Sequence, residues 1–112
     1  MLPIAAYVVL MKNEPTSIVA EDSIFKAAID GDPIAMYRVG ARKSDNRDAY
    51  AWFLVSGEHI ASAAVPHSVE MNRTEMEINT AIQRFRERFG DAERKDAELR
   101  AESVRKLIRP VS

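Results

Sequence analysis

The sequence predicts an all-α fold, a small helical domain of four to six helices, on three observations. Apolar residues recur at helical spacing, and no alternating strand pattern follows residue 20. Glycine, aspartate and proline fall where helices need to end and begin. The chain has 112 residues, of which 46% are apolar and 29% charged, the balance of a folded soluble protein. We therefore expect one domain over residues 1–112.

The first 14 residues contain the apolar run LPIAAYVVLM over residues 2–11. This run is too short to span a bilayer as a helix. Lys12 follows the run instead of preceding it, which is atypical of a signal peptide. We expect a buried first helix, with a short core strand as the alternative because the run contains β-favouring residues. The expected location is cytoplasmic, and export with cleavage after Ala20 is the alternative.

The stretch AIDGDPIAMYRVG predicts a joint between two helices. A helix over about residues 17–30 is expected to end at Gly31, because glycine reaches the left-handed conformation at little cost. Asp32 can cap the next helix, and Pro33 suits its first position, where no amide hydrogen is needed. We expect this second helix to run to about Lys43.

A third helix, predicted over about residues 47–64, is apolar on more than one side. Its main apolar face consists of Ala49, Trp52, Phe53, Ser56, Ile60, Ala63 and Ala64. A helix of this kind usually lies between neighbouring elements, so we expect it to be sandwiched. Gly40 in the preceding helix costs roughly 1 kcal/mol relative to alanine. We expect the close approach of a neighbouring helix to compensate for this cost.

Residues 72–109 predict charged C-terminal helices. Thr74 and Glu77 have capping-box spacing, which predicts a helix start after Asn72. Gly90 indicates a stop and restart, with one continuous helix as the alternative. The apolar positions of these helices are Ile78, Ile82, Phe85 and Phe89, then Ala97, Ala101, Val104 and Ile108.

The stretches AAIDGDPIAMYRVG and DNRDAYAWFLVSGE resemble a Sel-one-like repeat (SLR), a relative of the tetratricopeptide repeat, over about residues 24–58. The matching positions are Ala28, Gly31, Asp32, Ala35, Tyr37, Val39 and Gly40, then Asp48, Ala49, Trp52, Phe53 and Ser56. The connection ARKSDNR is shorter than usual, and one unit is visible where repeat folds generally need three or more. We therefore interpret residues 17–66 as a degenerate repeat with an antiparallel helix pair.

The resemblance implies a non-enzymatic protein-binding role, as an adaptor or scaffold without shared catalytic residues. The first helix of the pair offers Tyr37, Arg38 and Arg42 as candidate partner-binding residues. The competing interpretation for Tyr37 and Trp52 is a purely structural role in the core.

The residue types give no support for catalysis. The chain has no cysteine, and His59 and His67 lack the spacing of a zinc motif. Neither a nucleophile elbow nor a glycine-rich phosphate loop is present. We therefore expect no enzyme activity, no cofactor and no metal.

Two other functions are open. One is a helix-turn-helix DNA-binding protein using Arg38, Arg42 and Lys43, which the net charge of −1 disfavours. The other is a small regulatory or inhibitory protein that acts by occlusion or by homo-oligomerisation. The apolar N-terminus or the C-terminal helices would supply the docking surface.

Overall fold

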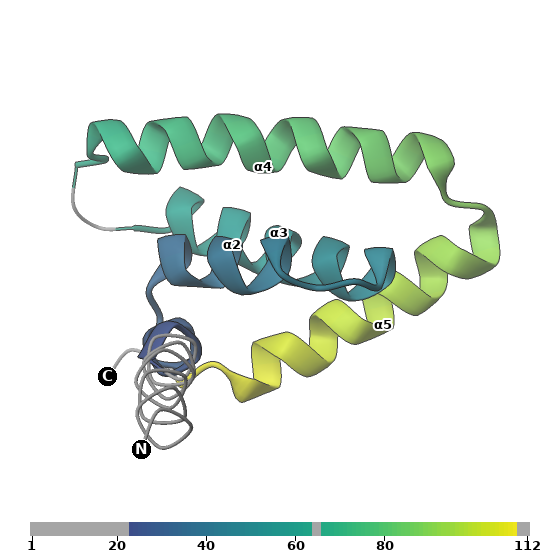
Figure 1. The fold of residues 1–112 in the computed structure, drawn as a ribbon, viewed down its shortest axis with the longest axis horizontal. Helices are drawn as coiled ribbons and strands as arrows, with labels where there is room; N and C mark the ends of the chain where they lie inside the picture. Colours follow the sequence, from purple (N-terminus) through teal and green to yellow (C-terminus); the bar gives the residue numbers. More distant parts are fainter. Residues whose placement is uncertain (1–22, 64–65, 110–112) are drawn as a thin grey trace, which may run out of the picture.

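The computed structural model describes residues 23–63 and 66–109, and it confirms the all-α fold. Five segments are helical in these ranges and none is a strand. After the helical residues 23–29 come α2 (Pro33–Ala41), α3 (Asn46–Ala61), α4 (Val69–Arg88) and α5 (Asp91–Leu107) (Figure 1). None of the described helices combines the length and the apolarity needed to cross a membrane. The predictions for residues 1–14 and for the start of the first helix lie outside the described residues.

The joint before α2 forms as predicted. Gly31 has a φ of +107°, in the left-handed region that favours glycine. The Asp32 carboxylate accepts hydrogen bonds from the amides of Ile34 at 3.0 Å and Ala35 at 3.4 Å. Pro33 is the first residue of α2. Local chemistry therefore determines where the first helix ends and the second begins.

The predicted start of α4 was wrong. The helix begins at Val69, and the Ser68 hydroxyl accepts a hydrogen bond from the amide of Met71 at 3.1 Å. Thr74 lies in the second turn and is buried, so it does not cap the helix with Glu77. The additional first turn brings Met71 into contact with the apolar cluster that α3 and α4 share. This gain in tertiary packing outweighs the local capping signal.

Helix α3 is the centre of the fold. Helices α2, α4 and α5 each pack against α3, whereas α2 and α4 contact each other only slightly. The buried residues of α3 are Ala49, Tyr50, Ala51, Trp52, Phe53, Val55, Ser56 and Ile60. The predicted sandwiched position of this helix is therefore confirmed. Trp52 belongs to the core, with 4% of its surface exposed.

The contact between α2 and α3 is close at both ends of α2. An ideal Cβ built on Gly40 would lie 2.9 Å from the Cβ of Trp52 and 2.8 Å from Cε1 of Phe53. At the other end, the Ser56 hydroxyl donates a 2.6 Å hydrogen bond to the carbonyl of Pro33. Gly40 therefore permits α2 and α3 to approach closely, as predicted from the presence of a glycine inside a helix.

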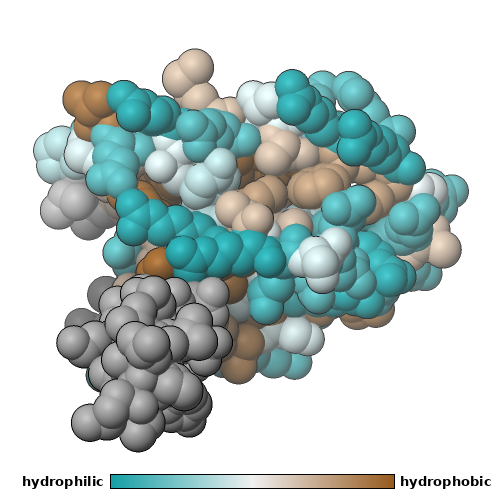
Figure 2. All heavy atoms as spheres, viewed as in Figure 1, coloured by the Kyte–Doolittle hydropathy of each residue, from teal (hydrophilic) through white to brown (hydrophobic). Residues whose placement is uncertain are grey.

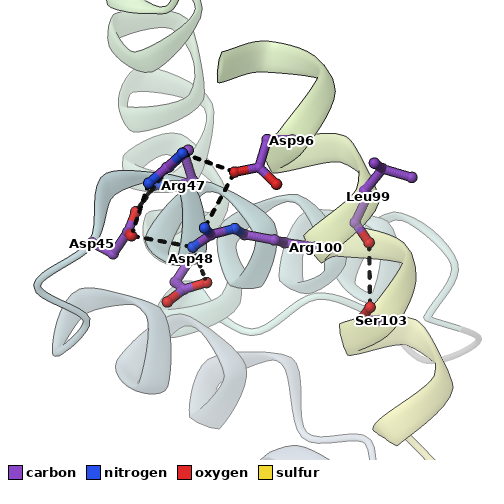
Figure 3. A network of polar contacts seen from close by, with 7 residues as sticks. All are labelled: Asp45, Arg47, Asp48, Asp96, Leu99, Arg100 and Ser103. Carbon is purple, nitrogen blue, oxygen red and sulfur yellow. Dashed lines mark hydrogen bonds and ion pairs between the residues drawn. The ribbon is translucent and has the colours of Figure 1, made fainter. Parts of the chain in front are cut away.

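Helix α5 is joined to α3 by a polar network at the start of α3 (Figure 3). The Arg100 guanidinium lies 2.8 Å from the Asp48 carboxylate, 3.2 Å from that of Asp45 and 3.2 Å from that of Asp96. Arg47 forms a second bridge to Asp96 at 2.9 Å. Asp96 and Arg100 are four residues apart on α5, a spacing that favours an ion pair on one helix face. The network fixes the first half of α5 across the N-terminal end of α3.

The far end of α5 closes the fold onto the helical residues 23–29. The Arg109 amide donates a 2.8 Å hydrogen bond to the carbonyl of Ile29. Ile108 and Val104 share a buried cluster with Ala28. Helix α5 thus connects the start of α3 to the end of the first described helix.

Two alanine substitutions should change stability in opposite directions. Gly40→Ala places a methyl against Trp52, and we expect overpacking of about 1–3 kcal/mol to exceed the gain of ~1 kcal/mol in helix propensity. Gly57→Ala is the matched control in α3, because its nearest neighbour would be Ile78 Cγ2 at 3.4 Å, an ordinary contact. We expect Gly57→Ala to stabilise by roughly 0.5–1 kcal/mol. Chemical denaturation measures both, and shifts in the same direction would contradict the assigned contact.

The polar network should make stability depend on acid pH. The amide of Arg47, and then its guanidinium, lower the pKa of Asp45 from 3.8 to about 2. Asp45 therefore binds its proton more weakly in the folded chain, and its contribution is lost as pH falls from about 4 to about 2. We expect Asp45→Asn, which keeps a cap acceptor, to be less stable than wild type at pH 7. Urea denaturation from pH 7 to pH 2 should show this difference shrinking, and a constant difference would refute the assignment.

Candidate partner-binding groove

A groove lies between α2 and α4, which both rest on α3 but barely touch each other. We call it the α2–α4 groove; it encloses about 440 Å³. Its lining residues are Tyr37 from α2 and Met76, Glu77, Thr80, Ala81 and Arg84 from α4. Figure 2 shows apolar atoms exposed in a hollow between hydrophilic bands on this face. The groove combines apolar area with the charged side chains of Glu77 and Arg84.

Tyr37 forms part of the groove and is half-buried there. Its ring stacks on Phe53 with centroids 5.2 Å apart, and Phe53 stacks in turn on Phe85 at 6.1 Å. This aromatic stack holds the Tyr37 ring against the body of the protein. Burial, together with the nearby Glu77 carboxylate, raises the pKa of the Tyr37 phenol. A tyrosine hydroxyl is protonated at neutral pH even without this shift, so it can donate a hydrogen bond.

Arg38 connects α2 to the start of α4 and is not among the residues that line the groove. Its guanidinium is 3.4 Å from the Glu70 carboxylate, so the pair bridges α2 and the first turn of α4. Both side chains are more than half exposed, at 55% and 59%, and such a pair contributes about 0–1 kcal/mol. Little stability is lost if another carboxylate replaces Glu70.

Arg42 is separated from the other two predicted residues. It is the C-cap of α2, is exposed, and is not among the residues that line the groove. The structure therefore places Tyr37 in the groove lining, Arg38 in a bridge from α2 to the first turn of α4, and Arg42 one turn further along α2.

The α4 wall of the groove was missed by sequence reasoning. Ile78 and Phe85 correctly indicated the core-facing side of α4. Ala81 lies beside that side, whereas Met76 lies nearly opposite it on the helix, in a stretch with few other apolar residues. The available signal was Met76, an apolar residue outside the core-facing pattern. The sequence did not show that α2 would lie opposite it.

A second groove runs along the other side of α4 and encloses about 350 Å³. It is lined by Leu54, Gly57, Glu58, Ala61, Glu75, Asn79, Ile82 and Arg86. The Glu58 carboxylate accepts hydrogen bonds from the Arg105 guanidinium at 2.7 and 2.9 Å. Arg86 Nε donates to the Tyr50 hydroxyl at 3.2 Å. Two of its three charged side chains are therefore already held by the protein.

The histidines do not form a metal centre with the groove. His59 Nδ1 lies 3.0 Å from the carbonyl oxygen of Val55, one turn earlier in α3. Residues 23–63 and 66–109 contain no group of three or more histidine, aspartate or glutamate side chains arranged to hold a metal ion. The chemistry that the groove offers is reversible binding through apolar, hydrogen-bonding and ionic contacts.

Comparisons with family models, with curated proteins and with solved structures found no match. The resemblance to a Sel-one-like repeat therefore continues to depend on the residues quoted for it. Assignment of function depends on the geometry of the chain itself.

The arrangement of Tyr37 and Glu77 predicts a specific effect on titration. Glu77→Gln removes the carboxylate that disfavours the phenolate, so the pKa of Tyr37 should fall. It should remain above 10, because burial is the larger cause and is unchanged. Titration of ¹³C-labelled tyrosine by NMR measures this shift. An unchanged Tyr37 pKa would show that Glu77 does not act on the hydroxyl.

Proposed function

We propose that this chain is a non-enzymatic protein-binding module that holds a segment of a partner protein in the α2–α4 groove. The observation that carries the proposal is the exposed apolar surface on α4 next to Tyr37. Met76 at the groove has 71% of its surface exposed. The implied role of Sel-like repeats in binding proteins agrees with this use of the surface, and the proposed setting is the cytoplasm.

The apolar surface extends along α4 beyond the groove. Val69 is 77% exposed and lies seven residues before Met76, which places both on one helix face. Full burial of a side chain of this size contributes about 1.5–3 kcal/mol. A partner that covers both residues therefore gains enough free energy to bind, if polar contacts at the rim also form.

Charged residues at the rim would select and orient the partner. Arg38 is available at low cost because its pair with Glu70 is exposed. Arg42 would meet a partner that extends past the end of α2. In this proposal Tyr37 serves both as support for the groove and as a hydrogen-bond donor to the partner.

Helix α5 favours a second candidate, the regulatory or oligomeric protein. Leu99 and Leu107 are 61% and 51% exposed and lie eight residues apart on this helix. They provide a smaller apolar surface on the opposite side of α3 from the groove walls. The partner-capture experiment in the next paragraph distinguishes binding through α5 from binding in the α2–α4 groove.

Capture of partners from lysate of the native host, with nuclease present, tests the proposal. Met76→Gln removes apolar area without adding charge, and it should weaken binding by about 1–2 kcal/mol, roughly tenfold in Kd. The partner should therefore be depleted on this variant. Leu99→Gln is the matched control, because Leu99 is also a largely exposed apolar residue, and this variant should retain the partner. Both variants should unfold like wild type, since neither side chain is buried.

The other outcomes identify the alternatives. Loss of the partner on Leu99→Gln but not on Met76→Gln would assign binding to α5. Recovery that disappears with nuclease, and affinity that falls steeply with salt, would indicate the DNA-binding alternative.

A further inference from the structure

We propose that the partner segment in the α2–α4 groove is an amphipathic helix carrying acidic residues. This inference rests on the proposed function and specifies the chemistry of the partner. It comes from the distribution of paired and unpaired charges along the α2-facing side of α4.

Five charged residues share this side of α4. Glu77 and Arg84 line the groove, and helical spacing places the others beside them. The set consists of Glu70, Arg73, Glu77, Arg84 and Arg88, all of them exposed.

Glu70 is paired with Arg38 at 3.4 Å. The other four members, Arg73, Glu77, Arg84 and Arg88, form no ion pair with another described residue. Along this side of α4 there are therefore three unpaired guanidinium groups and one unpaired carboxylate, and Arg84 lines the groove itself. Each guanidinium can bind a carboxylate through two hydrogen bonds.

The spacing of these arginines predicts the spacing of the partner's acids. At a rise of 1.5 Å per residue, Arg73 and Arg84 are about 17 Å apart along α4, and Arg88 lies about 6 Å further. A helix lying along the groove matches them with two acids one turn apart and a third about three turns away. Its apolar stripe would then face Tyr37, Met76 and Ala81.

The second groove, on the other side of α4, has the opposite character. Its charged lining residues are Glu58, Glu75 and Arg86, and the arginine is held by Tyr50. Glu58 is paired with Arg105, so the lining offers an acidic helix no free guanidinium and adds the carboxylate of Glu75. The two sides of α4 therefore discriminate between partners by charge.

A nucleic acid also carries anions that arginine binds, but the groove suits it less well. A phosphate backbone gains nothing from the apolar area of Met76 and Ala81. We therefore commit to a protein helix.

Three synthetic peptides of 18 residues test the inference on the full chain. They share one leucine stripe at helical spacing and differ in their flanking residues, which are glutamate, glutamine or lysine. Fluorescence anisotropy gives their affinities. We expect the glutamate peptide to bind about tenfold more tightly than the glutamine peptide, and the lysine peptide to bind most weakly.

Charge-removing variants locate the contact. Arg73→Gln combined with Arg84→Gln should weaken the glutamate peptide about tenfold and leave the glutamine peptide unchanged. Lys95→Gln combined with Lys106→Gln makes the same change in net charge on α5 and should have less than about a twofold effect. All four side chains are exposed, so folding is preserved.

Each contrary result has a defined meaning. All three peptides could bind wild type with equal affinity and bind the Met76→Gln variant more weakly. This result would refute the proposed acidic character of the partner and still support binding in the groove. A DNA duplex is tested in competition with the glutamate peptide. If the duplex displaces the peptide and binds with at least the same affinity, the choice of a protein helix is overturned. Failure of every peptide to bind would also overturn the inference, while partner capture would still test the proposed function.

Discussion

The close packing of α2 on α3 is the contact on which the rest of the structure depends. Gly40 allows the backbone of α2 to approach Trp52 and Phe53, and no larger residue fits there without displacement. With α2 seated in this way, α3 is covered on the sides that face α2, α4 and α5. A helix buried on several sides cannot take another position without exposing much apolar surface. The other helices are therefore arranged around α3.

The candidate binding surface follows from this arrangement. Helices α2 and α4 are each stabilised by α3, so they do not need to bury surface against each other. The space between them is open, with Tyr37 stacked against Phe53 and Met76 exposed at the edge. The α5 network has a different role, because its arginines and aspartates pair with one another. On the α2-facing side of α4, in contrast, Arg73, Arg84 and Arg88 pair with no other described residue.

Local signals predicted much of the fold, and tertiary neighbours determined what was missed. The Asp32 cap acts within three residues, so it could be recognised from the sequence alone. The capping pattern at Thr74 was equally good locally, but packing selected Ser68 as the start of α4. Tyr37 was predicted as a binding residue from its position on the first helix of the repeat-like pair. To predict Met76, one must also know which helix lies opposite α4. One sequence does not specify that pairing, because adjacent antiparallel helices can be arranged around a central helix in more than one order.

Native-state hydrogen exchange tests most directly the claim that α3 is the centre on which the domain depends. Amides in the interior of α3, between Ala49 and Ile60, should exchange most slowly, with opening free energies close to that of global unfolding. Amides in the middle of α4 should exchange faster, because α4 packs against α3 on one side and is exposed on the other. Protection that is higher in α4 or α5 than in α3 would contradict the account.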